Sequence, residues 1–308
     1  MRLAAIDIGT NSTKMTVADV SATGLLSVVS EESDVTRLGE GVDEARRLGD
    51  VPMARTLDAV IRFAGAARAL GAEIVLGAGT SALRDAVNGA DFIAKIKAGA
   101  DVEVQIISGD REAQLAYAAV RSDRSLAIPT EGSLLVFDIG GGSTELILGG
   151  ADGVGRYKSL DIGAVRLTER FLRSDPPAEA ELTQARQYAA NGLALFPRPD
   201  APLRVAGIGG TALNIAAVTS GQSRPDPDSI HGASVSSAEV SAALLRFSSV
   251  SLAARKTVPG LEPKRADVIV AGALILDALL TYFGSGTFLL SARGLRYGLL
   301  ADYANSRK

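Results

Sequence analysis

Two short stretches of this chain are nearly the same: Asp7-Ile-Gly-Thr-Asn-Ser-Thr-Lys14 and Asp138-Ile-Gly-Gly-Gly-Ser-Thr-Glu145. Each follows an apolar run, Leu3–Ile6 in the first case and Leu134–Phe137 in the second. In both, a strand ends at the aspartate, turns through glycine and hydroxyl residues, and enters a second strand. Such a hairpin turn can aim backbone N–H groups at an anion, and the aspartate offers a hard oxygen ligand for Mg²⁺. The repeat therefore predicts two similar lobes that face each other.

A third glycine loop, Gly207-Ile-Gly-Gly-Thr211, follows an expected strand and opens an expected helix. Backbone N–H groups at a helix N-terminus bind phosphate, so all three loops suit an oligophosphate ligand. A single glycine turn is more often structural, because glycine simply permits positive φ. A dinucleotide-binding fold is the main structural competitor, but no loop completes Gly-x-Gly-x-x-Gly, and the nucleotide P-loop pattern is absent from the sequence.

Composition limits the chemistry that the chain can perform. Its 308 residues suggest two domains at about 150 residues each. No cysteine is present, which rules out disulfides, thiolate metal sites and a cysteine nucleophile, and favours a cytoplasmic location. The single histidine, His231, cannot build a multi-histidine metal site, so carboxylates are the expected acid–base groups. A net charge of −3 argues against nucleic acid or a membrane surface as partner.

Hydrophobic periodicity predicts an alternating α/β chain. Strands are expected at about 2–8, 13–20, 24–30, 73–78, 102–107, 133–137, 144–149, 154–160, 203–206 and 286–290. Helices are expected at 54–70, 110–120, 178–195, 210–219, 236–248 and 264–283. The turn-rich segment 123–132 is the expected boundary, giving a first lobe over 1–125 and a second over 126–293. The apolar tract 268–280 is too short for a membrane span and predicts a buried helix, and the N-terminus has too few apolar residues for a secretory signal.

Eight motifs in order resemble the exopolyphosphatase/guanosine pentaphosphate phosphatase (Ppx/GppA) family of the actin/Hsp70/sugar-kinase superfamily. Besides the two aspartate loops, they are Arg37-Leu-Gly-Glu-Gly41, Thr80-Ser-Ala-Leu-Arg-Asp-Ala-Val-Asn88, Ile107-Ser-Gly-Asp-Arg-Glu-Ala113, Gly209-Gly-Thr211, Arg265-Ala-Asp267 and Leu295-Arg-Tyr-Gly-Leu-Leu300.

The resemblance implies two ribonuclease-H-like (actin-like ATPase) lobes with the active site in a central cleft. It also implies a final helix, at about 294–307, that returns to the first lobe. It also implies Mg²⁺-dependent hydrolysis, with Mn²⁺ as a substitute, of the terminal phosphate of inorganic polyphosphate or of guanosine pentaphosphate, with guanosine tetraphosphate as the related ligand. Longer members carry a C-terminal helical domain related to HD phosphohydrolases, which we expect this short form to lack. Thr10, Arg111 and Tyr297 depart from the family's usual residues.

The resemblance also assigns site residues. Glu112 is implied as the catalytic carboxylate that orients or deprotonates water, with Glu145 as a second catalytic carboxylate. Asp7, Asp138 and Glu145 are the implied metal ligands. The implied phosphate-binding residues are Asn11, Ser12, Thr13, Lys14, Arg84, Gly140, Gly141, Gly142, Ser143, Thr144, Gly209, Gly210 and Thr211, with Arg265 and Arg296 as weaker candidates.

Plainer interpretations stay open for several of these residues. Glu112 alone fits a solvated first-turn carboxylate that favours the helix dipole. Arg84 fits a surface ion pair, and His231 fits a structural or solvent-facing side chain. A sensor that binds (p)ppGpp or polyphosphate without hydrolysis, and a small-molecule kinase of the same superfamily, are the alternative functions. A homodimer is an open alternative for the oligomeric state.

Overall fold

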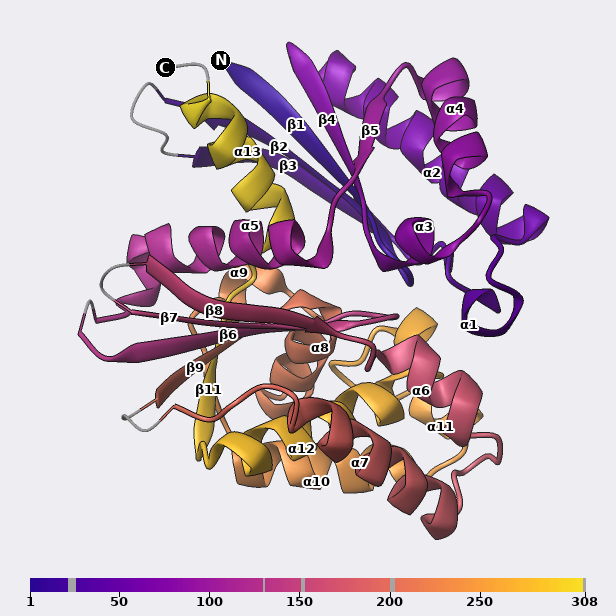
Figure 1. The fold of residues 1–308 in the computed structure, drawn as a ribbon, viewed down its shortest axis with the longest axis vertical. Helices are drawn as coiled ribbons and strands as arrows, with labels where there is room; N and C mark the ends of the chain where they lie inside the picture. The colour runs from indigo at the N-terminus through magenta and orange to yellow at the C-terminus, as the bar shows by residue number, and fades with distance from the viewer. Residues whose placement is uncertain (22–25, 130, 151–152, 200–202, 307–308) are drawn as a thin grey trace. The chain divides into compact units, whose positions relative to one another are not determined.

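The computed structural model spans residues 1–308 and describes all of them except 22–25, 130, 151–152, 200–202 and 307–308. The chain forms two compact units (Figure 1). The first unit contains Met1–Ala119 and Arg293–Lys308, and the second contains Val120–Ala292. The chain therefore passes between units twice, once after Ala119, within helix α5 (Gly109–Ser122), and once after Ala292.

A five-stranded sheet forms the centre of the first unit, in the order β3-β2-β1-β4-β5. Its strands are β1 (Arg2–Ile8), β2 (Thr13–Val20), β3 (Leu26–Asp34), β4 (Ile74–Gly79) and β5 (Glu103–Ile106). β1 pairs antiparallel with β2 and parallel with β4. Because side chains alternate along a strand, β1 has two faces to bury: Ala4, Ile6 and Ile8 belong to one apolar cluster, and Leu3 and Ala5 to another.

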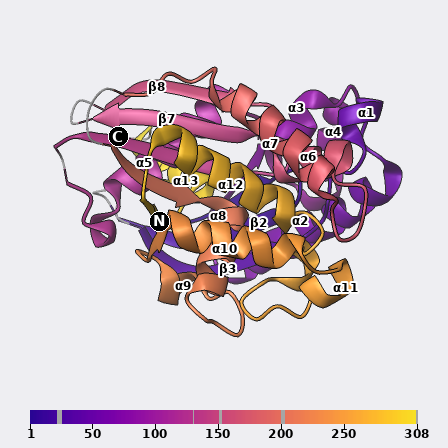
Figure 2. The same cartoon turned by 90° about the horizontal axis from the view of Figure 1, so that it is seen from below.

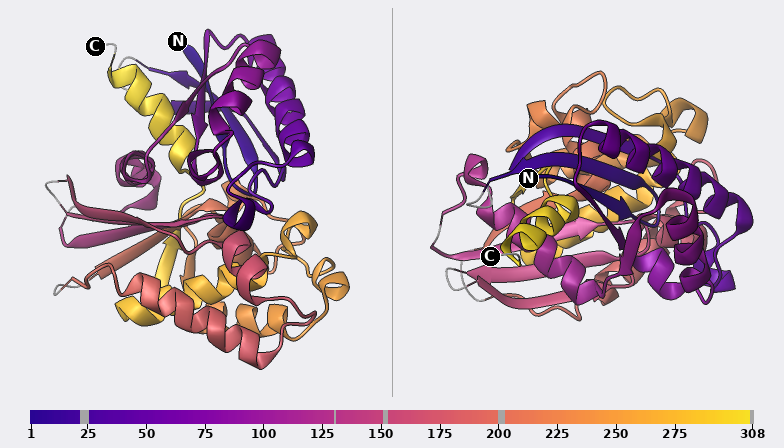
Figure 3. Two further views of the ribbon diagram at one scale, coloured as in Figure 1. Left: turned by 45° about the vertical axis from the view of Figure 1, so that its right-hand side comes forward. Right: turned by 90° about the horizontal axis from the view of Figure 1, so that it is seen from above.

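Helices cover both of these faces. α2 (Asp50–Ala69) and α4 (Gly89–Ala100) pack together on one side of the sheet, and α13 (Leu295–Asn305) packs on β1, β2 and β3 on the other (Figures 1 and 3). The helix at the end of the chain thus lies in the same unit as the first strand. Two short helices, α1 (Val42–Ala45) and α3 (Ser81–Asp85), lie in the connecting segments.

The second unit has a six-stranded sheet in the order β10-β11-β9-β6-β7-β8. Its strands are β6 (Ser133–Ile139), β7 (Thr144–Gly150), β8 (Gly153–Leu160), β9 (Leu203–Ile208), β10 (Ser234–Ser236) and β11 (Thr287–Leu290). Five of these strands repeat the order of the first sheet, with β8-β7-β6-β9-β11 standing for β3-β2-β1-β4-β5. The duplication seen in the aspartate loops thus extends to the topology of both sheets.

One face of this second sheet is covered by a layer of helices, among which α8, α10 and α12 pack against one another (Figure 2). The helices are α6 (Ala164–Phe171), α7 (Glu179–Leu193), α8 (Gly209–Thr219), α9 (Pro227–Ile230), α10 (Ser237–Ser248), α11 (Leu252–Arg255) and α12 (Ile269–Phe283). Two 3₁₀ turns, η1 (Arg124–Leu126) and η2 (Pro263–Arg265), complete the unit. Leu135, Phe137 and Ile139 alternate along β6 and enter the core beneath these helices.

The sequence-based expectation of an α/β protein with two sheets is confirmed. The apolar tract 268–280 forms the buried central helix α12, where Asp277 is only partly buried and accepts a hydrogen bond from Ser241. Within the part of the chain that the structure describes, no helix is long and apolar enough to cross a membrane.

Three expected elements differ clearly in their limits. Expected helix 54–70 corresponds to α2, which begins four residues earlier, at Asp50. Expected helix 264–283 begins only at Ile269, because Pro263–Arg265 forms the separate turn η2. The carbonyl of Ala266 is held by the buried Arg255 side chain at 2.9 Å, which takes it out of a regular helix. Expected strand 24–30 corresponds to β3, which begins at Leu26 and continues to Asp34; positions 24 and 25 lie outside the described residues.

Candidate active site

The first aspartate loop is the turn between β1 and β2. The N–H of Gly9 donates to the carbonyl of Ser12 at 3.1 Å, which closes the turn, and Asp7 stands opposite Lys14 in the antiparallel register. Directly opposite side chains share one face of the sheet, so a carboxylate and an ammonium group lie on the same face here. The expected hairpin is therefore present in the first unit.

Asn11, in this turn, is buried without using its side chain. It is 5% exposed, and neither the Nδ2 nor the Oδ1 atom of its amide has a hydrogen-bond partner among the described residues. Leaving a buried polar group unsatisfied costs about 1–3 kcal/mol, so folded proteins seldom do so without a reason. The first loop thus holds a buried donor and a buried acceptor that no described residue satisfies, which suits a loop that binds a polar ligand.

The segment that follows β3 hydrogen-bonds to the backbone of this loop. Backbone N–H groups of Arg37 and Gly39 donate to the carbonyls of Asn11 and Thr10, at 2.9 and 2.8 Å. A Cβ atom on Gly39 would lie 2.2 Å from the Thr10 methyl carbon, so a larger residue here would force Thr10 to shift. The motif at 37–41 therefore shapes the first loop through its backbone.

Arg84 and Glu112 lie together in the first unit. Arg84, on α3, donates from Nη1 to the carbonyl of Ile107 at 3.0 Å, and the same nitrogen lies 3.4 Å from Oε2 of Glu112. Glu112, in the first turn of α5, has a side chain only 13% exposed, and that of Arg84 is 26% exposed. The side chain of Glu112 is therefore not solvated, in contrast to the plainer interpretation of this residue. Arg84 does form the ion pair that the sequence left open, and this pair is partly buried.

The second aspartate loop repeats the first with a different charge pattern. The N–H of Gly140 donates to the carbonyl of Ser143 at 2.9 Å, as that of Gly9 does in the first loop, and Asp138 stands opposite Glu145. Two carboxylates opposite each other repel, and a bound cation would relieve this. Glu145 is 1% exposed and accepts a hydrogen bond from Ser159 at 2.8 Å. The second hairpin thus offers paired hard oxygen ligands where the first offers a carboxylate and an ammonium group.

The N-terminus of α6 holds the second loop in shape. The carbonyl of Gly141 accepts from the backbone N–H groups of Val165 and Arg166, and the carbonyl of Gly142 accepts from Nε of Arg166 at 2.7 Å. A Cβ atom on Gly163 would lie 2.3 Å from the Gly141 oxygen, so the two segments touch through their backbones. Arg166 is 7% exposed and is a supporting residue that sequence reasoning missed.

The third loop lies against the second. β6 and β9 are parallel with Asp138 next to Ile208, and the hydroxyl of Thr211 donates to the carbonyl of Ile139 at 3.0 Å. Gly209 has φ +84°, and a Cβ atom there would lie 2.1 Å from Oδ1 of Asp138. The aspartate side chain therefore occupies the space that a side chain at position 209 would need, beside the start of α8.

Arg265 covers the next glycine of the same loop. A Cβ atom on Gly210 would lie 2.2 Å from the guanidinium carbon of Arg265, which is 8% exposed and bonds through Nε to Glu262 at 3.1 Å. This buried cation sits at the start of α8, beside the expected phosphate loop. Sequence reasoning made Arg265 a weak candidate for phosphate binding. Its place in the Arg265-Ala-Asp267 motif was the only feature of the sequence that pointed to such a role.

Arg296, the other weak candidate, anchors the last helix. Its guanidinium donates to the carbonyl of Met15 at 2.8 Å and lies 3.1 Å from Glu31, while its neighbour Tyr297 is buried. Arg111, the departure next to Glu112, pairs with Asp302 of the same helix. Both arginines thus join α13 to the rest of the first unit.

The expected site residues fall into two sets. The first unit carries Asp7, Asn11, Ser12, Thr13, Lys14, Arg84 and Glu112, and the second carries Asp138, Gly140, Gly141, Gly142, Ser143, Thr144, Glu145, Gly209, Gly210 and Thr211. Across the described ranges, no three carboxylate or histidine side chains gather into a ready metal cluster. Asp138 and Glu145 are the expected metal ligands that the second unit brings together by itself.

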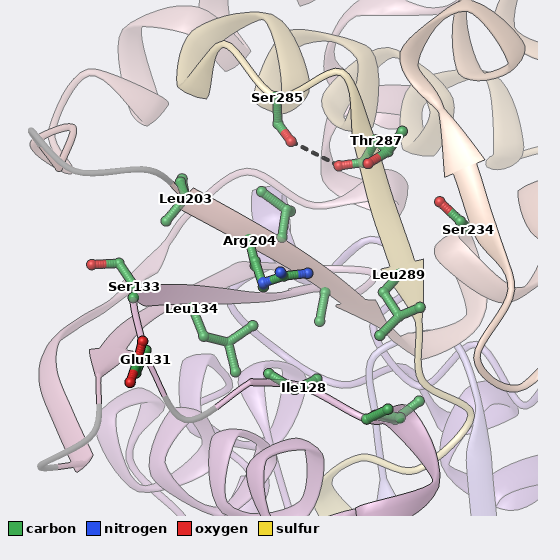
Figure 4. A pocket seen from close by; sticks show the side chains of 15 residues that line it. Ile128, Glu131, Ser133, Leu134, Leu203, Arg204, Ser234, Ser285, Thr287 and Leu289 are labelled. Atoms are coloured by element: carbon green, nitrogen blue, oxygen red, sulfur yellow. Dashed lines mark hydrogen bonds between the residues drawn. The ribbon is translucent and has the colours of Figure 1, made fainter.

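A cavity of about 590 Å³ lies elsewhere in the second unit (Figure 4). Ser133 and Leu134 of β6 and Leu203 and Arg204 of β9 line it, at the ends of these strands opposite to the loops. None of the expected site residues lines this cavity. In open α/β sheets, ligands bind at the carboxyl ends of the parallel strands, where the glycine loops lie.

Comparisons with known proteins show the family of this chain. A family model for the Ppx/GppA phosphatase family matches residues 16–307. Exopolyphosphatase 2 of Mycobacterium tuberculosis is 37% identical over 293 residues, covering 90% of this chain and 89% of the relative. The crystal structure of the Aquifex aeolicus Ppx/GppA family member superposes with a TM-score of 0.81 at 30% identity, covering 100% and 99% of the two chains. An exopolyphosphatase-like protein superposes with a TM-score of 0.90 at 29% identity, covering 99% and 98%. The chain belongs to the Ppx/GppA phosphatase family.

Proposed function

We propose that this phosphatase is an Mg²⁺-dependent exopolyphosphatase that removes the terminal phosphate of inorganic polyphosphate. The observation that carries the proposal is the buried Asn11 amide, whose donor and acceptor are both unused in a loop that the second unit repeats. Glycine loops with exposed N–H groups recognise phosphate oxygens, and three such loops suit a chain of phosphates. The name of the Mycobacterium tuberculosis relative supports polyphosphate as that chain.

In the proposed reaction, Glu112 binds and deprotonates the attacking water. The water oxygen forms a bond to the terminal phosphorus while the bond from that phosphorus to the bridging oxygen breaks. The products are orthophosphate and a polyphosphate shorter by one unit, which leaves with the electron pair of the broken bond. The proton taken by Glu112 returns to solvent. A carboxylate acting as general base contributes about 10²–10⁴-fold to such a rate.

Arg84 has a double role in this proposal. Its Nη1 lies 3.4 Å from Oε2 of Glu112 and 3.0 Å from the Ile107 carbonyl oxygen. A guanidinium group has five N–H donors, so Arg84 can bind a terminal phosphate with its remaining donors while it stays close to the base. The cation would then neutralise charge on the phosphoryl group and orient Glu112 at the same time.

The residues of the second unit fit Mg²⁺. Asp138 and Glu145 supply two opposed carboxylates, and Mg²⁺ is usually held by one or two carboxylates together with water and substrate phosphates. When bound, the ion would neutralise charge on the phosphates. The role of the protein is to hold these oxygens beside the glycine loops.

A phosphate-release screen tests the proposal. The substrates are tripolyphosphate, long-chain polyphosphate, guanosine pentaphosphate and ATP, each with Mg²⁺ and with excess chelator. Release of orthophosphate from polyphosphate only with Mg²⁺ is the expected result. Guanosine pentaphosphate ends in the same kind of phosphoanhydride, so its hydrolysis to tetraphosphate is the second expected activity.

Other outcomes would replace the proposal. Tight polyphosphate binding without any phosphate release would indicate the sensor, and ATP-dependent transfer to a small acceptor would indicate the kinase. We also propose a cytoplasmic location, which the absence of cysteine favours. Measurement of the molecular mass in solution would decide between a monomer and a homodimer.

A further inference from the structure

His231, the only histidine of the chain, joins two segments that are distant in sequence. It follows α9, and its side chain is 12% exposed. Its Nδ1 atom accepts the backbone N–H of Ala292 at 3.1 Å. Its Nε2 atom lies 2.8 Å from the hydroxyl oxygen of Ser125 and 3.2 Å from Oδ2 of Asp123. The ring thus contacts residues 106 positions before it and 61 positions after it.

The hydrogens of this cluster can be assigned from its geometry. Ser125 donates its hydroxyl hydrogen to Oδ1 of Asp123 at 2.6 Å. Because Nδ1 of His231 accepts from Ala292, the neutral ring carries its proton on Nε2 and donates it to Ser125 and Asp123. Activating Ser125 as a nucleophile would require Nε2 to accept a proton instead. The cluster therefore holds segments together and is not a second hydrolytic site.

The partners of His231 lie at the two places where the chain passes between the units. Asp123 and Ser125 come just after the first crossing, at 119/120, and Ala292 is the last residue before the second, at 292/293. Backbone bonds strengthen the second contact: the N–H of Gly232 donates to Leu290 at 2.9 Å, and that of Leu290 donates to Ala233 at 2.8 Å. One imidazole ring therefore ties the entry of the second unit to its exit.

The entry segment continues directly from the helix that carries Glu112. α5 begins at Gly109, has Glu112 in its first turn, and ends at Ser122, next to Asp123. A helix transmits a displacement of one end to the other, because its backbone hydrogen bonds keep it stiff. Whatever fixes Asp123 therefore also fixes the far end of the helix on which the proposed base stands.

We propose that His231 is a positioning residue for the phosphatase reaction: it holds the two crossings at a fixed spacing and thereby sets the position of Glu112 through α5. The kinetic part of this inference rests on the proposed function. We call the contacts of His231 with Asp123, Ser125 and Ala292 the clamp. Loss of the clamp should lower kcat and leave KM nearly unchanged, because Glu112 moves while the glycine loops still bind phosphate. A misplacement of about 1 Å can cost about 100-fold in rate, so we expect a fall of about ten- to a hundred-fold in kcat.

Three variants test the clamp on the full chain. His231→Leu removes the contact of Nδ1 with Ala292 and the contacts of Nε2 with Ser125 and Asp123. His231→Asn keeps a short side-chain acceptor near the Nδ1 position and loses the contacts to Ser125 and Asp123. Ser229→Ala is the matched control, because Ser229 lies two residues away. Among the described residues, its hydroxyl bonds to Gln222 and Asp226, close to it in sequence. Circular dichroism establishes that each variant is folded.

Hydrogen exchange measures the clamp without any substrate. In His231→Leu, the amides of 120–126 and 289–292 should both exchange faster, by up to about tenfold, as expected for one lost hydrogen bond. In His231→Asn, the Ala292 amide should keep its protection while 120–126 lose theirs. Ser229→Ala should leave both segments unchanged. Faster exchange confined to 229–233 in His231→Leu would overturn the clamp.

Kinetics on polyphosphate test its consequence. The expected pattern is reduced kcat with unchanged KM for His231→Leu, partial rescue by His231→Asn, and wild-type values for Ser229→Ala. A folded His231→Leu protein with wild-type kcat would refute the positioning role. If the wild-type protein releases no phosphate from any substrate, the proposed function has failed, and the exchange data alone still decide whether His231 ties the two crossings.

Discussion

Nη1 of Arg84 lies 3.4 Å from Oε2 of Glu112, so the proposed phosphate-binding cation and the proposed base are neighbours within one unit. The guanidinium is fixed from behind by the Ile107 carbonyl, and both side chains are largely buried. Such a pair presents a carboxylate whose position is defined before substrate binds. Arg84 therefore contributes to the orientation of Glu112, and we expect the effects of variants of the two residues not to be additive.

Removing the base should slow the reaction without preventing binding. Glu112→Gln keeps the size and the hydrogen bonding of the side chain but loses the ability to take a proton. We expect turnover to fall by about 10²–10⁴-fold while polyphosphate affinity, measured by calorimetry, survives. The control is Asp110→Asn, an exposed carboxylate in the same first turn of α5. A folded Glu112→Gln protein with near-normal turnover would return the role of base to Glu145 or to the substrate.

The unused amide of Asn11 predicts opposite effects on stability and function. Asn11→Ala removes two unsatisfied buried polar atoms, so the free energy of unfolding should stay equal or rise, by up to about 1–3 kcal/mol. Polyphosphate affinity should fall. Asn88 is the matched control, because its amide bonds to both the N–H and the carbonyl of Leu48, at 2.8 and 3.1 Å. Asn88→Ala should therefore destabilise the fold. Urea unfolding and calorimetry measure both quantities, and destabilisation by Asn11→Ala would refute this interpretation.

We predict that position 209 must be glycine because the Asp138 side chain occupies the adjacent space, and not only because of the positive φ at the start of α8. Gly209→Ala would place a Cβ atom 2.1 Å from Oδ1 of Asp138 at φ +84°, so the carboxylate must move. We expect a higher Mg²⁺ concentration for half-maximal activity and a loss of about 100-fold in rate. Gly221→Ala is the control: it also has positive φ, +69°, but no atom lies within 4 Å of its Cβ position. Equal losses in the two variants would mean that backbone strain alone is responsible.

Metal removal tests the carboxylates of the second unit. Excess chelator should abolish phosphate release, and Mg²⁺ or Mn²⁺ should restore it, because both ions prefer oxygen ligands. Asp138→Asn should raise the metal concentration required for activity, in contrast to Glu112→Gln, which should not. Full turnover in excess chelator would show that these carboxylates have another role.

Tyr297 predicts a loss of stability at high pH. Burial, and then the neighbouring Glu31 carboxylate, raise the pKa of the Tyr297 hydroxyl well above its ordinary value. The unfolded chain releases this proton near pH 10, whereas the folded chain keeps it, so the unfolded state binds fewer protons above that pH. The free energy of unfolding should therefore fall as pH rises above about 10. Urea unfolding at pH 9, 10 and 11 should show a smaller decline for Tyr297→Phe, and parallel declines would contradict the assignment.

The sequence by itself determined the two hairpins and the α/β class, and it proposed the candidate site residues. The loops at 7–14 and 138–145 are each encoded within eight neighbouring residues, where glycine turns and flanking apolar strands act locally. Strand and helix periodicities are local as well, so the α/β class could be predicted. The predicted start of the helix at 264–283 was wrong because it depends on a contact that is not local. Arg255, eleven residues away, binds the Ala266 carbonyl.

Only the tertiary structure decided which of these residues touch. Arg84 reaches Glu112 across 28 positions, and the parallel register of β6 and β9 brings Gly209 against Asp138. The burial of Asn11 and the clamp at His231 follow likewise from packing between distant segments. Periodicity fixes the face on which a side chain lies, but the partner that it meets depends on how the connections bring elements together. A single sequence holds no local signal for that partner.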